Sequence, residues 1–94
     1  MIATLTNSFI LAAAAFSACP SESNVDCLWA AERGLFEALD TAPDTDPSII
    51  PVNWFGCTLR GVVAGGQIFA GLPDGEEEID PGTGQPSRLL RLPA

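Results

Sequence analysis

The sequence predicts an α+β fold: two N-terminal helices packed on a small antiparallel sheet of three or four strands, with extended N- and C-terminal arms. Alanine-rich and helix-periodic apolar patterns fill the first part of the chain, and runs of β-branched residues separated by a Gly-Gly pair follow. A chain of 94 residues is expected to form one domain, 1–94. Its parts are a helical half (1–40), a sheet half (49–72), and an acidic loop with an extended C-terminal arm (73–94).

The first helix is expected to start at Asn7 or Ser8, whose side chains can accept hydrogen bonds from the first free N–H groups of a helix. Four consecutive alanines favour helix, and Pro20 ends it after Ala18. Residues 1–6 are expected to form a short extended arm or a lead-in to this helix.

The apolar stretch 9–19 superficially resembles a secretory signal that ends in a lipoprotein cleavage box. A signal has basic residues before its apolar region, whereas the first basic residue here is Arg33. The stretch is also shorter than the roughly 20 residues that cross a bilayer. We therefore interpret it as a buried core helix.

A second helix follows a polar turn, with Ser23 and Asp26 in an arrangement close to a capping box. Its apolar residues recur at helical spacing, and it ends before Pro43. The expected stripe is Val25, Leu28, Trp29, Leu35, Phe36 and Leu39. The predicted core of the whole domain is Phe9, Phe16, Trp29, Phe36, Leu39, Trp54, Val62 and Ile68.

The sheet half begins with an expected strand at 49–55, which Pro51 confines to a sheet edge or a bulge. Residues 57–64 and 67–72 then form a hairpin, because the intervening Gly-Gly pair supplies the positive φ angles of a two-residue turn. Gly61 and Gly71 indicate bulges or a close approach of the backbone by another chain.

The composition excludes most enzyme chemistry, because the chain contains no His, Lys or Tyr. Cys19, Cys27 and Cys57 lack metal-type spacing, and we expect them to be buried small hydrophobes. Asp44 and Asp46 resemble the start of a calcium loop whose Gly and closing Glu are missing. We therefore expect no enzymatic activity, no catalytic residues, no metal and no cofactor.

The formal net charge of −8 argues against nucleic acid and anionic membranes as partners, because both are bound through Lys and Arg. All five acidic side chains of the C-terminal third lie in the run 74–80, which we interpret as a solvated loop. The run is followed by a Gly- and Pro-rich segment that favours a flexible tail in isolation.

The C-terminal arm combines arginines with leucines, which is unusual for a free tail of an acidic protein. We predict that it binds a neighbouring subunit by adding a strand to an exposed sheet edge, with its arginines paired to carboxylates there. The predicted partner-binding residues are Arg88, Leu89, Leu90, Arg91 and Leu92.

An apolar content of 47% with only 17% charged residues exceeds what one small core can hide, so part of the surface is expected to be covered by other subunits. We therefore predict a non-enzymatic, homo-oligomeric subunit of a large assembly. The most specific prediction is a capsid decoration (cement) protein of a tailed bacteriophage. It would bind the major capsid protein outside the shell, in a virion assembled in the host cytoplasm. The alternatives are a head–tail connector or tail protein, and a lipoprotein-like accessory subunit of a membrane complex.

Overall fold

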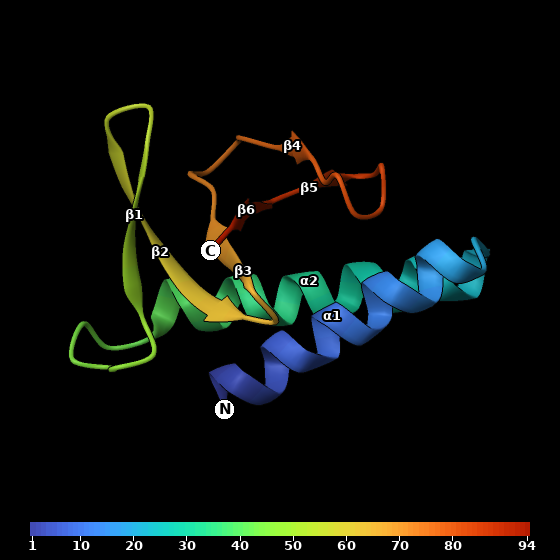
Figure 1. Cartoon of the computed structure of the whole chain (residues 1–94), viewed down its shortest axis with the longest axis horizontal. Coiled ribbons are helices and arrows are strands. Elements are labelled where there is room, and N and C mark those ends of the chain that lie inside the picture. The colour runs from blue at the N-terminus through green and yellow to red at the C-terminus, as the bar shows by residue number, and fades with distance from the viewer.

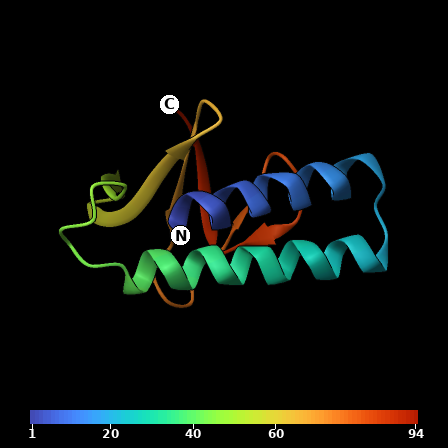
Figure 2. The ribbon, with the colours of Figure 1, turned by 90° about the horizontal axis from the view of Figure 1, so that it is seen from below.

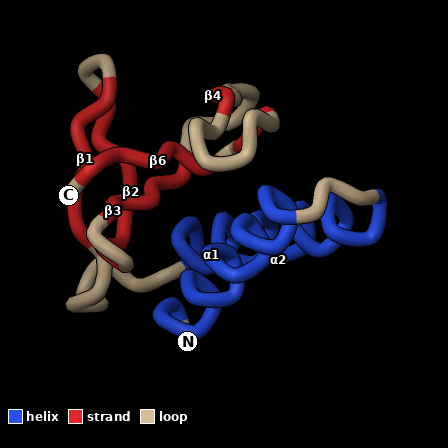
Figure 3. The backbone as a smooth tube through the Cα atoms, turned by 45° about the vertical axis from the view of Figure 1, so that its right-hand side comes forward, coloured by secondary structure: helices blue, strands red, loops and turns tan.

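Two N-terminal helices pack against one face of a four-stranded antiparallel sheet in the computed structural model, which describes residues 1–94 (Figure 1). The helices lie side by side on one side of the molecule, and the sheet lies on the other (Figures 2 and 3). They are α1 (Ile2–Ala18) and α2 (Glu22–Thr41). The sheet has the order β1-β2-β3-β6, with strands β1 (Ile50–Trp54), β2 (Cys57–Ala64), β3 (Gln67–Gly71) and β6 (Leu89–Pro93). A separate two-stranded ribbon consists of β4 (Glu78–Ile79) and β5 (Pro86–Ser87).

The expected extended arm at the N-terminus is wrong, because α1 already begins at Ile2. The first turns of α1 are held by burial: Ile2 is 7% and Thr6 0% exposed, and the Thr6 hydroxyl donates to the Ile2 carbonyl oxygen at 2.7 Å. This bond lets the polar side chain lie inside the core. Further along α1, Phe9, Ala13 and Phe16 continue the buried stripe, as expected of a core helix.

The cap of α2 is Ser21 rather than Ser23. Its side-chain oxygen accepts a hydrogen bond from the N–H of Asn24 at 3.1 Å, which satisfies one of the free donors of the first turn. The Asn24 side chain in turn donates to the carbonyl oxygen of Cys19 at 2.8 Å. Asn24 therefore ties the start of α2 to the end of α1.

The buried stripe of α2 is centred on a different side of the helix from the predicted stripe. Leu28, Leu35 and Leu39 are at most 2% exposed, whereas Trp29 is 46% exposed, so its assignment to the core is wrong. One residue corresponds to about 100° around a helix, so the helix–sheet contact that centres on the leucines turns Trp29 outward. Glu32, one turn after Leu28, is half-buried at the border of the stripe.

The strands of the sheet half agree with their predicted bounds to within one residue, and β1 with Pro51 is an edge strand as expected. The turn between β2 and β3 is formed by Gly65 and Gly66, with φ angles of 60° and 74°. The β1–β2 turn is formed by Phe55 and Gly56, with φ angles of 45° and 80°. Both hairpins thus have two-residue turns with positive φ, which match the twist of the strands.

The close approach predicted at Gly61 comes from within the chain. A Cβ atom at Gly61 would lie 2.7 Å from Cγ2 of Val52 and 3.2 Å from the carbonyl oxygen of Phe69. At Gly71 the nearest neighbour is the ring of Phe36, at 3.4 Å. Neither glycine therefore indicates a second chain.

The C-terminal segment is a strand of the chain's own sheet and not a free arm. β6 pairs with β3 from Gly71 opposite Leu89 to Gln67 opposite Pro93. The pairing extends beyond both ends of the strands. The N–H of Leu72 donates to the carbonyl oxygen of Arg88, and the N–H of Ala94 donates to that of Gly66. The expected extended conformation is present, but its hydrogen bonds are made within the chain.

The main core lies between the helices and the sheet, and Phe9 and Phe69 meet edge to face in it with ring centroids 5.6 Å apart. Of the predicted core residues, Phe9, Phe16, Leu39 and Val62 are buried, while Phe36, Trp54 and Ile68 are partly buried. The buried members of this core are Ile2, Phe9, Ala13, Phe16, Leu28, Leu35, Leu39, Val62, Phe69 and Leu89.

Candidate functional site

The face of the sheet that points away from the helices is apolar. Side chains alternate between the two faces of a strand, so the neighbours of the inward-facing Val62, Phe69 and Leu89 point outward. We call this surface the outer sheet face. None of its residues is charged. Four of them are at most 6% exposed, and the others remain partly accessible to solvent. Its residues are Ile50, Val52, Trp54, Leu59, Val63, Ile68, Ala70, Leu72, Leu90 and Leu92.

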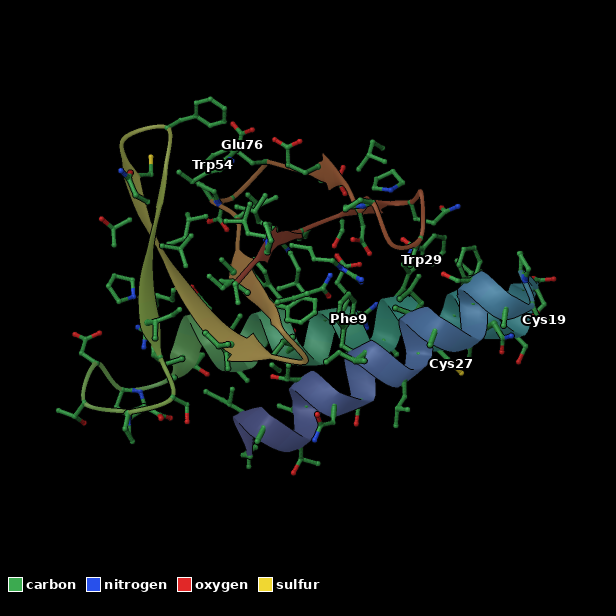
Figure 4. All side chains as sticks on the ribbon, in the orientation of Figure 1. Phe9, Cys19, Cys27, Trp29, Trp54 and Glu76 are labelled. Carbon is green, nitrogen blue, oxygen red and sulfur yellow. The ribbon has the colours of Figure 1, made fainter.

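The β1–β2 turn projects away from the helices (Figure 1) and carries Phe55, whose side chain is 86% exposed. Trp54 stands beside it, with ring centroids 4.9 Å apart in an edge-to-face arrangement; Figure 4 labels Trp54 at this end of the hairpin. We call Trp54, Phe55 and Gly56 the hairpin tip. It places two aromatic side chains next to each other at the end of a protruding hairpin.

Phe55 is the only residue other than glycine with a positive φ angle. A side chain in this left-handed region costs about 1–2 kcal/mol, and the position favours Asn, Asp or Gly. The chain therefore keeps an exposed aromatic residue where both solvation and backbone conformation disfavour it. Such strain is concentrated at functional sites, which makes the hairpin tip the leading candidate.

Both edges of the sheet offer few hydrogen-bond donors to an added strand. The backbone hydrogen bonds that Leu72 and Ala94 donate place the even-numbered residues of this segment, from 88 to 94, toward β3. The main-chain groups of 89, 91 and 93 therefore point to the free edge. On that edge, the Leu89 N–H donates a hydrogen bond to the Ser87 hydroxyl oxygen at 3.0 Å, and Pro93 has no N–H. The same alternation places Pro51 on the free edge of β1. Prolines and internal bonds thus protect both edges.

The five residues predicted to bind a partner occupy different environments. Leu90 and Leu92 lie on the outer sheet face, half-buried against their neighbours. Leu89 points to the opposite side and is 2% exposed in the main core. Arg88 and Arg91 contact carboxylates of their own chain. Partner binding by this segment remains a prediction, and its accessible apolar part is Leu90 with Leu92.

Arg91 lies inside the protein, with a side chain that is only 14% exposed. Its Nη2 donates to Oδ2 of Asp80 at 3.0 Å, and Nε lies 2.9 Å from Oδ1, although its N–H is not aligned for a second hydrogen bond. The guanidinium carbon is 5.2 Å from the ring centroid of Phe69 and 5.9 Å from that of Phe9. Arg91 therefore joins β6 to the acidic segment and to the core.

Asp80 is 4% exposed, so the interpretation of the whole run 74–80 as a solvated loop is wrong at this residue. Its carboxylate accepts hydrogen bonds from the Gly82 N–H at 3.3 Å and the Thr83 hydroxyl at 3.2 Å, besides that from Arg91. The Ser17 hydroxyl donates to the Gly82 carbonyl oxygen at 2.7 Å, which fastens this loop to α1. Asp80 thus organises the turn between β4 and β5 and gives Arg91 a buried counter-charge.

Arg88 and Glu32 make the second link between the C-terminal segment and the helices. The Arg88 N–H donates to Oε1 of Glu32 at 2.7 Å, and its guanidinium lies 4.0 Å above the ring of Phe36. Burial raises the pKa of Glu32 above its ordinary value. Hydrogen bonds from Arg88 and Ser87 oppose that shift, and the charge of Glu77 adds to it.

This raised pKa predicts a pH dependence of stability. At pH values below the unfolded-state pKa of 4.5, the contribution of Glu32 to the free energy of unfolding is fully present. This contribution is lost as the pH rises through the higher pKa of the folded state. In urea unfolding between about pH 4 and pH 7, Glu32→Gln should therefore gain stability relative to the wild type as the pH rises. Glu37→Gln, on an exposed position of α2, is the control. A constant difference between Glu32→Gln and wild type across this range would contradict the prediction.

The three cysteines are free and exposed, so their expected burial is wrong. Cys19 follows the end of α1, Cys27 lies on the solvent side of α2, and Cys57 flanks the hairpin tip. The Cys, Asp and Glu side chains nowhere gather in a group of three that could hold a metal ion. Asp44, from the calcium-like segment, lies 3.3 Å from Nη1 of Arg60, which also donates to the Ala42 carbonyl oxygen through Nη2.

Sequence reasoning missed the hairpin tip, although a signal was present. Phe55 and Gly56 separate two strand-like runs by two residues, which is the spacing of a tight hairpin, and Gly56 fits its second position. The prediction of one strand over all of 49–55 hid the exposure of Phe55. The outer sheet face could be anticipated only from the fact that both sides of the strands are apolar.

Comparison with models of protein families, with curated proteins and with solved structures finds no match for this chain. Neither α1 nor α2 combines the length and the hydropathy that a membrane-crossing helix requires.

Proposed function

We propose that this protein is a non-enzymatic structural subunit that docks on other protein subunits through the hairpin tip and the adjoining outer sheet face. The observation that carries the proposal is Phe55, a strained aromatic residue that is 86% exposed. Aromatic side chains are the residues that most often dominate binding energy at protein interfaces. In the isolated chain Phe55 gains an edge-to-face contact with Trp54 but stays exposed in a strained conformation, a cost that a partner's pocket would offset.

The many carboxylates without an ion pair support the proposal of a subunit on the outside of a particle. Arg60, Arg88 and Arg91 form ion pairs with Asp44, Asp74 and Asp80 of the same chain, which leaves Arg33 as the one arginine without an ion pair. The other nine of the twelve carboxylates have no such partner. A surface of this kind repels phosphate and suits contact with protein.

The specific role that we propose is capsid decoration in a tailed bacteriophage, with the major capsid protein as the surface that receives the subunit. Small size, acidity and protected sheet edges support this role, because a decoration protein must be soluble before it binds and must not aggregate through its strands. The C-terminal leucines Leu90 and Leu92 would lie within the contact area.

Co-sedimentation from the native source tests the proposal. A tag at the N-terminus is suitable because Met1 is 94% exposed. The tagged wild-type chain should sediment with particles of virion size and be accessible to protease on their outside. Phe55→Asn should be depleted from the particles at least about 30-fold, the loss expected for an aromatic anchor. Leu11→Asn is the matched control, because Leu11 is 70% exposed on α1, outside the proposed contact.

Other results would redirect or overturn the assignment. Incorporation of Phe55→Asn at wild-type occupancy would exclude the hairpin tip as the docking device. A chain that stays in the low-mass fraction would refute a structural role in a particle. Protection inside the particle would indicate a connector or tail component. Membrane fractionation with a modified Cys19 would indicate the lipoprotein alternative.

A further inference from the structure

We infer that the hairpin tip of one copy docks into a groove of a second copy beside the N-terminal end of α1, so that copies associate head to tail. The groove has a volume of about 340 Å³ and lies between α1, the loop before β1 and the far end of the β1–β2 hairpin. We call it the N-terminal groove. This inference rests on the proposed function and deepens it: it assigns the hairpin tip to a neighbouring copy and leaves the outer sheet face, with Leu90 and Leu92, to the capsid protein.

The N-terminal groove is lined by uncharged residues only, and five of its nine lining residues are hydrophobic. Three other grooves on the surface each include at least one carboxylate: Asp40 and Asp74 in the first, Glu32, Glu37 and Glu77 in the second, and Asp46 in the third. The N-terminal groove therefore differs in kind from them. Its lining is Ala3, Thr6, Asn7, Pro47, Ser48, Ile50, Val62, Val63 and Ala64.

Charge selects this groove as the receptor for a second copy. Each chain has a net charge of −8, so copies repel one another wherever carboxylates would meet or be buried. The hairpin tip (Trp54, Phe55 and Gly56) is uncharged as well. A contact between the tip and the N-terminal groove therefore brings together two carboxylate-free surfaces, and among the grooves of this acidic protein described above only this one allows it.

The size of the groove fits an aromatic side chain. A cavity of about 150 Å³ is enough to bind benzene, so 340 Å³ leaves room for the phenyl ring of Phe55 and part of the turn. Burying an aromatic side chain removes about 150–250 Å² from water. The contact is small, and we expect it to be weak between two isolated copies and strengthened where many copies assemble.

The fold prevents a chain from filling its own groove. The tip lies between the end of β1 and the start of β2, whereas Ile50 at the start of β1 and Val63 and Ala64 at the end of β2 line the groove. The five residues of β1 separate them by about 17 Å. Each copy thus offers one tip and one groove at opposite ends of the same hairpin, whose two ends can be followed in Figure 1. Such a contact joins different surfaces and builds rings or filaments.

Association of the pure, full-length protein tests the inference. Sedimentation velocity between micromolar and millimolar concentrations should show the wild type growing from monomer to dimer and beyond. Phe55→Asn should associate at least about 30-fold more weakly, and it should fold, because Asn suits the turn. Ala3→Glu places a carboxylate in the groove, at a helix start where acidic residues are tolerated, and should weaken association similarly. Ala14→Glu, on an exposed position of the same helix away from the groove, should behave as wild type.

Mixing the two defective variants gives a test specific to a head-to-tail contact. Phe55→Asn retains an intact groove, and Ala3→Glu retains an intact tip. An equimolar mixture should therefore form heterodimers but no trimers, although each variant alone stays monomeric. A symmetric dimer that uses the same surface on both copies would not be restored by mixing.

Salt distinguishes a second copy from a basic partner. Raising the ionic strength from about 0.01 M to 0.15 M shortens the screening length from about 30 Å to 8 Å, so association of two acidic copies should tighten. A monomeric wild type up to millimolar concentration, or undiminished association of Phe55→Asn, would overturn the inference. If Phe55→Asn is nevertheless lost from native particles, the proposed function stands and the tip binds a different protein.

Discussion

Replacing Arg91 by methionine is expected to destabilise the protein by about 3–5 kcal/mol, because it leaves the carboxylate of Asp80 buried without its counter-charge. Asp80 is 4% exposed, and its two remaining partners, the Gly82 N–H and the Thr83 hydroxyl, are neutral donors. The whole free energy of unfolding of a domain of this size is about 5–15 kcal/mol. The loss should therefore be visible as a large fall in the urea midpoint.

The control for Arg91→Met is the double variant Asp80→Asn with Arg91→Met, which removes both charges. It should recover most of the lost stability, because a buried pair replaced by neutral groups of similar shape is often nearly neutral. Equal losses in the single and double variants would show that packing of the Arg91 side chain against Phe9 and Phe69 matters more than the charge pair.

Replacing Phe69 by alanine is expected to cost about 3–5 kcal/mol, the range for a fully buried aromatic residue. Phe69 is 0% exposed, contacts the ring of Phe9 edge to face, and lies at the centre of the sheet beneath the helices. The cavity would open in the main core, where both helices and β6 converge. Thermal or urea unfolding measures the loss.

Trp29→Ala is the matched control for Phe69→Ala, because it removes a larger aromatic side chain that is 46% exposed. Its expected cost is below about 1 kcal/mol, in the range of surface substitutions. A loss for Trp29→Ala as large as that for Phe69→Ala would mean that the helix stripe in solution is centred one residue away from Leu28.

Local sequence signals were sufficient for most of the secondary structure. Alanine content and helical periodicity predicted both helices, Gly65 with Gly66 predicted the second hairpin, and Pro51 predicted an edge strand; all four agree with the structure. These features depend on the preferences of neighbouring residues, which act within a few positions along the chain.

The candidate site was predicted only in part, because the hairpin tip depends on one residue, Phe55, at a single position of the β1–β2 turn. The apolar excess indicated an uncovered surface. Of the leucines predicted to bind a partner, Leu90 and Leu92 lie partly buried on the outer sheet face and Leu89 is buried in the main core, and their binding of a partner stays a prediction. Phe55 was missed, since a phenylalanine in a turn that prefers Asn or Gly goes against local propensity. Departures of this kind are expected where function outweighs local preference.

The sequence by itself determined the α+β class, the order of the elements and the absence of histidine and lysine chemistry. Only the tertiary structure decided which side of α2 is buried, that Asp80 leaves solvent to meet Arg91, and that 89–93 completes the chain's own sheet. Each of these outcomes depends on contacts between residues that are distant along the chain. The free energy of such contacts, from burial and charge pairing, exceeds the local preferences that a sequence pattern reports.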